Sequence, residues 1–151
     1  MESNMQLQFV TAEKEDIETI FSHLKQLIDA YEDLSSINYE KVLAWCRRQI
    51  EENIGEYTCI LSDGEKAGWY NFSASDDGRM ELDNFYVLPE YRSQGIGTAA
   101  LHRCFAETDK PIFLYCFTQN TRAMALYARM GFRVIEYEGT TRCIMQRNPE
   151  E

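Results

Sequence analysis

The sequence is poor in residues that hold metals or form disulfides. It has only two histidines, His23 and His102, which fall on separate predicted helices. Its five cysteines lie far apart and include no C-x-x-C pair. An odd number of isolated cysteines argues against both a disulfide framework and a zinc site. We therefore expect free, mostly buried thiols and no metal site.

Cationic residues and long apolar segments are also scarce. The 151 residues include 15 Lys and Arg against 25 Asp and Glu, a formal net charge of −10. Such a charge disfavours binding to nucleic acid and mildly favours cationic small molecules or basic peptides, although acidity can also serve solubility alone. Polar residues interrupt every apolar run before the roughly 20 residues of a membrane span, and the N-terminal segment has no signal-peptide pattern. We expect a cytoplasmic protein without membrane association.

The chain length fits one domain over residues 1–151, since no repeat or long linker divides it. Apolar residues at helical spacing predict helices over about 13–31, 39–53, 96–107 and 121–130. Alternating or continuous apolar runs predict strands over about 6–10, 57–61, 67–73, 80–87, 112–117, 132–138 and 141–147. Two helices and an antiparallel meander of three strands thus precede the alternating second half, which predicts a mixed α+β domain.

A loop with two glycines joins the predicted strand at 80–87 to the helix at 96–107. Gly95 and Gly97 stand where the helix begins, after Pro89 and Arg92. Free N–H groups at a helix start and the helix dipole favour an anion, and glycine lets a phosphate approach the backbone. A tight corner and a dinucleotide-binding turn are the alternatives, the latter because Ala100 completes G-x-G-x-x-A. A dinucleotide turn belongs early in alternating β-α units, so the preceding meander disfavours it.

Residues 92–97, Arg-Ser-Gln-Gly-Ile-Gly, resemble the signature of the GNAT superfamily of N-acetyltransferases: Arg or Gln, two residues, Gly, any residue, then Gly or Ala. The stretch from Leu82 to Tyr91 resembles the family's fourth strand and the following loop. Asn120 to Phe132 resembles its N-x-x-A-x-x-x-Y-x-x-x-G-F motif. Two motifs in order are far more specific than either alone. The resemblance implies the GNAT fold, a mostly antiparallel twisted sheet of six to seven strands, flanked by about four helices and splayed between strands 4 and 5.

The resemblance also implies acetyl-coenzyme A as the cofactor. Backbone amides from Gln94 to Thr98 would hold its pyrophosphate, with Arg92 beside it, and its pantetheine arm would pair with the strand at 85–87. Asn120 would contact the cofactor, although its position equally suits a helix N-cap. The implied cofactor-binding residues are Phe85, Tyr86, Val87, Arg92, Ser93, Gln94, Gly95, Ile96, Gly97, Thr98, Asn120 and Tyr127.

Direct transfer to a primary amine needs a group that takes the amine's proton and a group that protonates the leaving thiolate. The resemblance assigns the acid to Tyr127, for which packing on a helical face is the alternative. Glu81, four residues before Phe85, is the expected base through a water, and Asp83 competes with it. Both carboxylates would point to the same side of their strand, where a solvated polar face is the alternative. The N–H of Phe85 is the expected oxyanion donor, and no pattern indicates a covalent intermediate.

The acceptor is expected to be a small-molecule amine or a peptide amino group, and a homodimer is left open. Aromatic faces near carboxylates suit an amine, although core packing is the alternative for the aromatic residues. The candidate substrate contacts are Tyr31, Tyr70, Asp83 and Phe117. A non-catalytic acyl-coenzyme A-binding sensor or assembly domain is the alternative function. The intact glycine loop and the presence of Tyr127 favour an enzyme.

Overall fold

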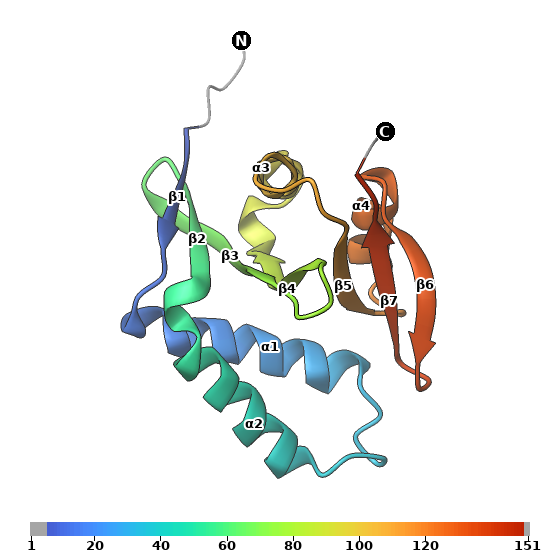
Figure 1. Cartoon of the computed structure of the whole chain (residues 1–151). Coiled ribbons are helices and arrows are strands. Elements are labelled where there is room, and N and C mark those ends of the chain that lie inside the picture. The colour runs from blue at the N-terminus through green and yellow to red at the C-terminus, as the bar shows by residue number, and fades with distance from the viewer. Residues whose placement is uncertain (1–5, 150–151) are drawn as a thin grey trace.

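A seven-stranded sheet forms the centre of the computed structural model, which describes residues 6–149 (Figure 1). Its strand order is β1-β2-β3-β4-β5-β7-β6. The strands are β1 (Leu7–Thr11), β2 (Tyr57–Ser62), β3 (Glu65–Ala74), β4 (Met80–Val87), β5 (Ile112–Phe117), β6 (Arg133–Glu138) and β7 (Arg142–Arg147). All neighbouring strands are antiparallel except β4 and β5, which are parallel. The predicted strands are confirmed, with shifts of a few residues at their ends.

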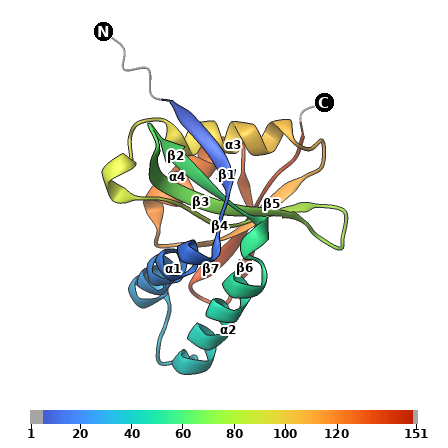
Figure 2. The ribbon, with the colours of Figure 1, turned by 90° about the vertical axis from the view of Figure 1, so that its left-hand side faces the viewer.

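Four α-helices cover the two faces of the sheet, as the two views in Figures 1 and 2 show. One face carries α1 (Ile17–Tyr31) and α2 (Tyr39–Glu52), and the other carries α3 (Ile96–Ala106) and α4 (Thr121–Arg129). Short 3₁₀ turns occupy Lys14–Asp16, Ile54–Glu56 and Pro89–Tyr91. The mixed α+β architecture expected from the sequence is confirmed. Within residues 6–149, no helix has the length and apolar character needed to cross a membrane.

Each face of the sheet has its own apolar core. The larger core lies under α3 and α4, with Tyr70, Leu101 and Met145 among its buried members. The smaller core lies under α1 and α2 and includes Ile50 and Trp69. Adjacent residues of a strand point to opposite faces, so Trp69 and Tyr70 of β3 enter different cores. All five cysteines are free as expected; four of them are buried and Cys46 is half-buried.

The parallel strands β4 and β5 separate along their length. They pair only at Met80–Ile112 and Glu81–Phe113. Beyond these positions β4 continues along β3, where Val87 pairs with Gly68, while β5 continues along β7 up to Phe117. The splay expected between the fourth and fifth strands is therefore confirmed. It leaves a V-shaped gap that opens toward the carboxyl ends of both strands.

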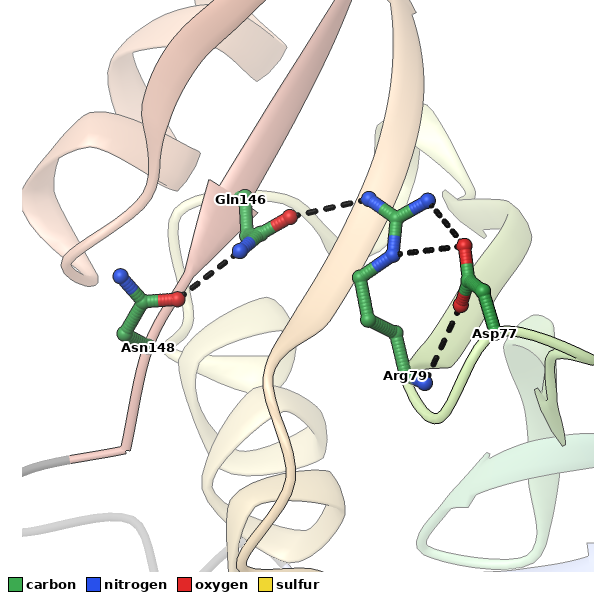
Figure 3. A network of polar contacts seen from close by, with 4 residues as sticks. All are labelled: Asp77, Arg79, Gln146 and Asn148. Carbon is green, nitrogen blue, oxygen red and sulfur yellow. Dashed lines mark hydrogen bonds and ion pairs between the residues drawn. The ribbon is translucent and has the colours of Figure 1, made fainter.

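A polar network joins the strands near the closed end of this gap (Figure 3). The Arg79 guanidinium donates to Asp77 Oδ2 from Nε at 3.0 Å and from Nη2 at 2.6 Å, and to Gln146 Oε1 from Nη1 at 2.9 Å. It also lies over the Phe113 ring, 4.0 Å from the centroid. Gln146 in turn donates to Asn148 Oδ1 at 2.9 Å. Arg79 thus connects the β3–β4 turn with β5 and β7.

A β-bulge changes the direction of side chains in the second half of β4. Asn71 pairs with Asp83 and Trp69 with Tyr86, so the two residues Asn84 and Phe85 lie opposite one residue of β3. Asn84 has a positive φ of 50°. A bulge of this kind re-aims side chains beside a functional site. Here it occurs where β4 leaves β5.

Candidate active site

A cavity of about 680 Å³ fills the gap between β4 and β5 and continues under α1 and α2. Its walls come from eight elements: α1, α2, β2, β3, β4, β5, α4 and the start of β7. The residues used below are Glu32, Lys41, Trp45, Cys46, Tyr57, Asn71, Asp83, Phe85, Tyr86, Val87, Tyr115, Phe117, Asn120, Arg122, Tyr127 and Arg142. The cavity is large enough for part of a cofactor and a second small molecule.

The glycine loop forms an open helix start next to this cavity. Gly95 is the N-cap of α3 with a positive φ of 81°, and no side chain caps the helix there. A Cβ at Gly95 would meet no atom within 4 Å, so the dihedral, not crowding, demands glycine. Ser93 also has a positive φ, of 64°. The amides of Ile96, Gly97 and Thr98 begin the helix and have no intrahelical acceptor, which suits an anion such as a pyrophosphate.

Gly97 serves a different purpose from Gly95. A Cβ at this position would lie 3.2 Å from Leu126 Cδ2 and 3.8 Å from Phe85 Cζ. Glycine therefore allows α3 to pack closely on α4 and on β4. The sequence analysis attributed both glycines to phosphate access, and for Gly97 the structure adds this packing requirement.

Two arginines face the region between the ends of β4 and β5. Arg92 Nε donates to the Val87 carbonyl at 2.9 Å, and its guanidinium lies 5.1 Å from the Tyr86 ring centroid. Arg122 lines the cavity from the first turn of α4, and its pKa is lowered by burial and by the nearby charge of Arg92. Neither arginine has an ion pair with a carboxylate of residues 6–149. Two unpaired cations close together favour an anionic ligand.

The sequence analysis missed Arg122. A signal for it existed, because a cation in the first turn of a helix opposes the helix dipole. Such a position suggests that the charge serves another purpose, and an anion bound beside it is the simplest one.

The edge of β4 that faces the cavity has no strand partner. Phe85, Tyr86 and Val87 line the cavity and lie beyond the last β4–β5 pair, while Tyr86 and Val87 pair with β3 on their other side. Backbone groups on this edge can therefore bond an extended ligand, as in strand addition. The residues expected to contact the pantetheine arm are thus brought to the cavity.

Tyr127 and Asn120 enter the cavity from α4. The Tyr127 side chain is 7% exposed and lies near Phe85, with ring centroids 6.3 Å apart. Burial is the main cause that raises its pKa, so its hydroxyl holds a proton at neutral pH. Asn120 is the N-cap of α4 and its Oδ1 accepts from the Ala123 N–H at 3.4 Å. It also lines the cavity, so its capping position does not remove it from the site.

The two candidate bases are placed differently. Asp83 lines the cavity, and although water reaches it there, the surrounding protein raises the pKa of its carboxyl. Glu81 is not among the cavity-lining residues. It lies at the closed end of the gap, where it pairs with Phe113 of β5. Burial and the charge of Asp83 raise its pKa as well. The structure therefore does not bring Glu81, the expected base, to the cavity, and it does bring Asp83.

The three aromatic residues expected to contact the substrate differ in their position relative to the cavity. Phe117 lines the cavity. Tyr31 lies outside the lining and packs beside Phe117, with ring centroids 5.8 Å apart. Tyr70 does not reach the cavity: it is 2% exposed in the core under α3, edge-on to Phe85. The expectation of a substrate contact at Tyr70 is corrected, because its position on β3 directs it to the face opposite that of Trp69.

The sequence analysis also missed two polar side chains of the cavity wall. Asn71 is 7% exposed, and its Oδ1 has no hydrogen-bond partner in the part of the chain that the structure describes. Tyr57 accepts a hydrogen bond from Asn84 Nδ2 at 2.6 Å. A buried acceptor without a donor is costly, so Asn71 Oδ1 is suited to a ligand N–H. Within residues 6–149, no group of His, Cys, Asp or Glu side chains has the arrangement of a metal site.

Comparison with known proteins gives one consistent family. Residues 20–132 match the model of the acetyltransferase (GNAT) family. An uncharacterised N-acetyltransferase of Mycobacterium bovis is 28% identical over 116 residues, which cover 74% of this chain and 69% of that protein.

Solved structures agree in fold. The PaiA N-acetyltransferase of Thermoplasma acidophilum, in complex with coenzyme A, superposes with a TM-score of 0.68 at 20% identity, covering 95% of this chain and 99% of its own. The ribosomal-protein-S18-alanine N-acetyltransferase of Escherichia coli gives 0.67 at 22% identity, covering 97% and 96%. The open start of α3, the unpaired arginines and the free edge of β4 fit the cofactor of this family. The chain therefore belongs to the GNAT acetyltransferase family and is an acetyl-coenzyme A-dependent acyltransferase.

Proposed function

We propose that the protein transfers the acetyl group directly to a primary amine bound beside Asp83. The observation that carries the proposal is the cavity itself. It brings together a proton acceptor at Asp83, a proton donor at Tyr127 and the free edge of β4, and it continues beyond them under α1 and α2. A domain that only senses acyl-coenzyme A would not need this additional space.

The cofactor-binding groups of the chain form two sets, one for the phosphates and one for the extended arm of the cofactor. The amides at the start of α3, with Arg92 and Arg122, hold the phosphates, and the edge of β4 at 85–87 holds the extended arm. Acetyl-coenzyme A supplies an acetyl thioester, whose carbonyl carbon bonds to the amine nitrogen as the carbon–sulfur bond breaks. The Phe85 N–H is the donor proposed for the carbonyl oxygen, where negative charge develops.

Asp83 removes the proton that prevents the amine from acting as a nucleophile. A primary amine has a pKa near 10 and is mostly protonated at neutral pH. The raised pKa of Asp83 makes this carboxylate a stronger base than an ordinary aspartate, which favours the transfer. Asn71 Oδ1 lies on the strand beside Asp83 and accepts a second amine N–H, which orients the nitrogen.

Tyr127 gives its proton to the departing thiolate. Its buried hydroxyl stays protonated at neutral pH and lines the same cavity as Asp83. The two groups therefore act on different atoms of the reaction, as a general base and a general acid.

An amine-panel assay that follows free thiol release tests this proposal. We expect thiol release that depends on one class of primary amine, and we expect Tyr127→Phe to lower kcat by about 10²-fold with little change in acetyl-coenzyme A binding. Tyr137→Phe is the matched control, because Tyr137 on β6 is 69% exposed and outside the cavity. Binding of acetyl-coenzyme A without turnover of any amine would instead support a sensor.

A further inference from the structure

The charges that line the cavity differ from those of the whole chain. Acidic residues outnumber basic ones by 25 to 15 in the sequence. In the cavity wall, Lys41, Arg122 and Arg142 face only two carboxylates, Glu32 and Asp83. Within residues 6–149, none of these five side chains takes part in an ion pair, whereas Lys25, Arg47, Lys66 and Arg79 are all paired. Unpaired charges that line a cavity are available to a ligand.

Arg142 is a cation of the cavity wall that is not among the proposed cofactor-binding groups. It begins β7 opposite Phe117 of β5, and its guanidinium lies 5.8 Å from the Tyr115 ring centroid. The thiol of Cys46, another residue of the cavity wall, is affected by both charges: Asp83 raises its pKa and Arg142 lowers it, while burial is the largest cause. Asp83 and Arg142 both line this one cavity, as does Tyr115, beside which the Arg142 guanidinium lies.

Two large aromatic side chains of the cavity wall are exposed. Trp45 of α2 is 55% exposed and Tyr115 of β5 is 45% exposed, and both line the cavity. A smaller hollow of about 280 Å³ continues past Arg142 to the β6–β7 turn and shares Glu32 and Arg142 with the main cavity. Glu32 is held there by a hydrogen bond from Thr141 Oγ1 at 2.6 Å.

We infer that the acceptor is a primary amine that also carries a carboxylate, with its amine at Asp83 and Asn71 and its carboxylate at Arg142. This inference rests on the proposed function and specifies its substrate class. A polyamine would place a second ammonium against Arg142 and Lys41, which repel it. A guanidinium is instead well matched to a carboxylate, which it can bind through two parallel hydrogen bonds. The methylene groups of the acceptor would lie against Trp45 and Tyr115.

Matched pairs of acceptors test the inference in the thiol-release assay. Each ω-amino acid is compared with its carboxamide, which keeps the reacting amine and loses the negative charge. We expect kcat/KM to be at least about tenfold higher for the carboxylate form. Arg142→Gln should remove this preference, because kcat/KM should fall at least about tenfold more for the carboxylate form than for the carboxamide, and Arg142→Lys should keep part of it. Arg133→Gln is the control, because Arg133 is exposed on β6 outside the cavity.

Two further arms locate the source of the carboxylate and separate the possible failures. Peptides with an acidic or an amidated second residue show whether the carboxylate belongs to a free amino acid or to a peptide. Equal rates for both members of every pair, or an unchanged preference in Arg142→Gln, would overturn the inference while the proposed function stands. Loss of turnover with every amine, despite acetyl-coenzyme A binding, would overturn the proposed function and this inference with it.

Discussion

Asp83, the proposed base, illustrates how a charge needed for catalysis opposes stability. The surrounding protein removes water from its carboxyl and so raises its folded-state pKa above that of an ordinary aspartate. The folded protein therefore binds this proton more tightly than the unfolded chain does. The resulting loss in the free energy of unfolding is absent below the unfolded pKa. It grows as the pH rises toward the folded pKa and is complete above the folded pKa. At neutral pH the ionised carboxylate destabilises the fold.

Asp83→Asn is therefore expected to lower kcat by about 10²-fold and to raise the melting temperature at pH 7 to 8. The gain in melting temperature should shrink as the pH falls through the folded pKa and vanish below the unfolded pKa, where the wild-type carboxyl is neutral in both states. Glu81→Gln is the control: its pKa is raised as well, but it lies outside the cavity, so it should change stability in the same direction and kcat by less than about threefold. A larger loss of turnover in Glu81→Gln would reverse the assignment of the base.

For single residues, the sequence predicted those at fixed motif positions well, but it did not distinguish between neighbouring candidates for one role. Tyr127 and Asn120 occupy fixed places in a motif, and the structure brings both to the cavity. Glu81 and Asp83 could not be separated, because alternation gives them the same facing and no local pattern shows that the pairing of β4 with β5 ends at Glu81. Tyr70 was misassigned for a related reason, since the pattern of β3 does not show which face meets α1.

Gly68 shows how one residue fixes the position of an element. A Cβ at Gly68 would lie 2.3 Å from the Tyr86 carbonyl oxygen and 3.1 Å from Val87 Cα, both of β4. Tyr86 and Val87 pair with β3 on one backbone edge, and their other backbone edge faces the cavity. Close approach of β3 and β4 therefore depends on glycine here.

Gly68→Ala should destabilise the protein by about 3 kcal/mol, because β3 and β4 must separate to admit the methyl group. Urea unfolding measures this change. The displaced edge of β4 should also weaken acetyl-coenzyme A binding. Gly55→Ala serves as the control, because its Cβ would meet no atom within 4 Å, and it should change stability by less than about 0.5 kcal/mol. Equal stabilities for both variants would show that β4 adjusts without cost.

The helices and strands were predictable because their periodicities are regular. The apolar spacing in Ile17–Tyr31 and the continuous apolar run in Ile112–Phe117 define their elements directly. The antiparallel meander of β2, β3 and β4 was predicted from alternating strands with turns between them. The rest of the strand order and the splay came only through the family resemblance, since periodicity does not specify which distant strands pair. The bulge at Asn84 and the network around Arg79 depend on contacts between distant segments, which no local pattern contains.

At the scale of the whole molecule, net charge does not describe the cavity. The chain has a charge of −10, whereas three of the five charged side chains that line the cavity are cations. Coenzyme A is itself strongly anionic, and an acidic protein must gather cations locally to bind it. Arg92, which precedes α3, and Arg122 in the first turn of α4 are the cations that we propose for this purpose.

Acetyl-coenzyme A binding should therefore raise the stability of the entire fold. A ligand at 100 times its dissociation constant stabilises the native state by about 2.7 kcal/mol. For a chain of this size, that corresponds to a rise of roughly 5–10 °C in melting temperature. Gly95→Glu should abolish the rise, because it places a carboxylate at the N-terminus of α3, where we propose that the phosphates bind.

Gly64→Glu is the matched control for this substitution. Gly64 in the β2–β3 turn has a φ of 83°, against 81° for Gly95, and a Cβ at either position would meet no atom within 4 Å. Both variants therefore carry the same backbone strain, about 1–2 kcal/mol, and should melt at similar temperatures without ligand. Only Gly64→Glu should then regain stability when acetyl-coenzyme A is added. If Gly95→Glu responded equally, the phosphates would have to bind away from the start of α3, and the cofactor assignment of this loop would be wrong.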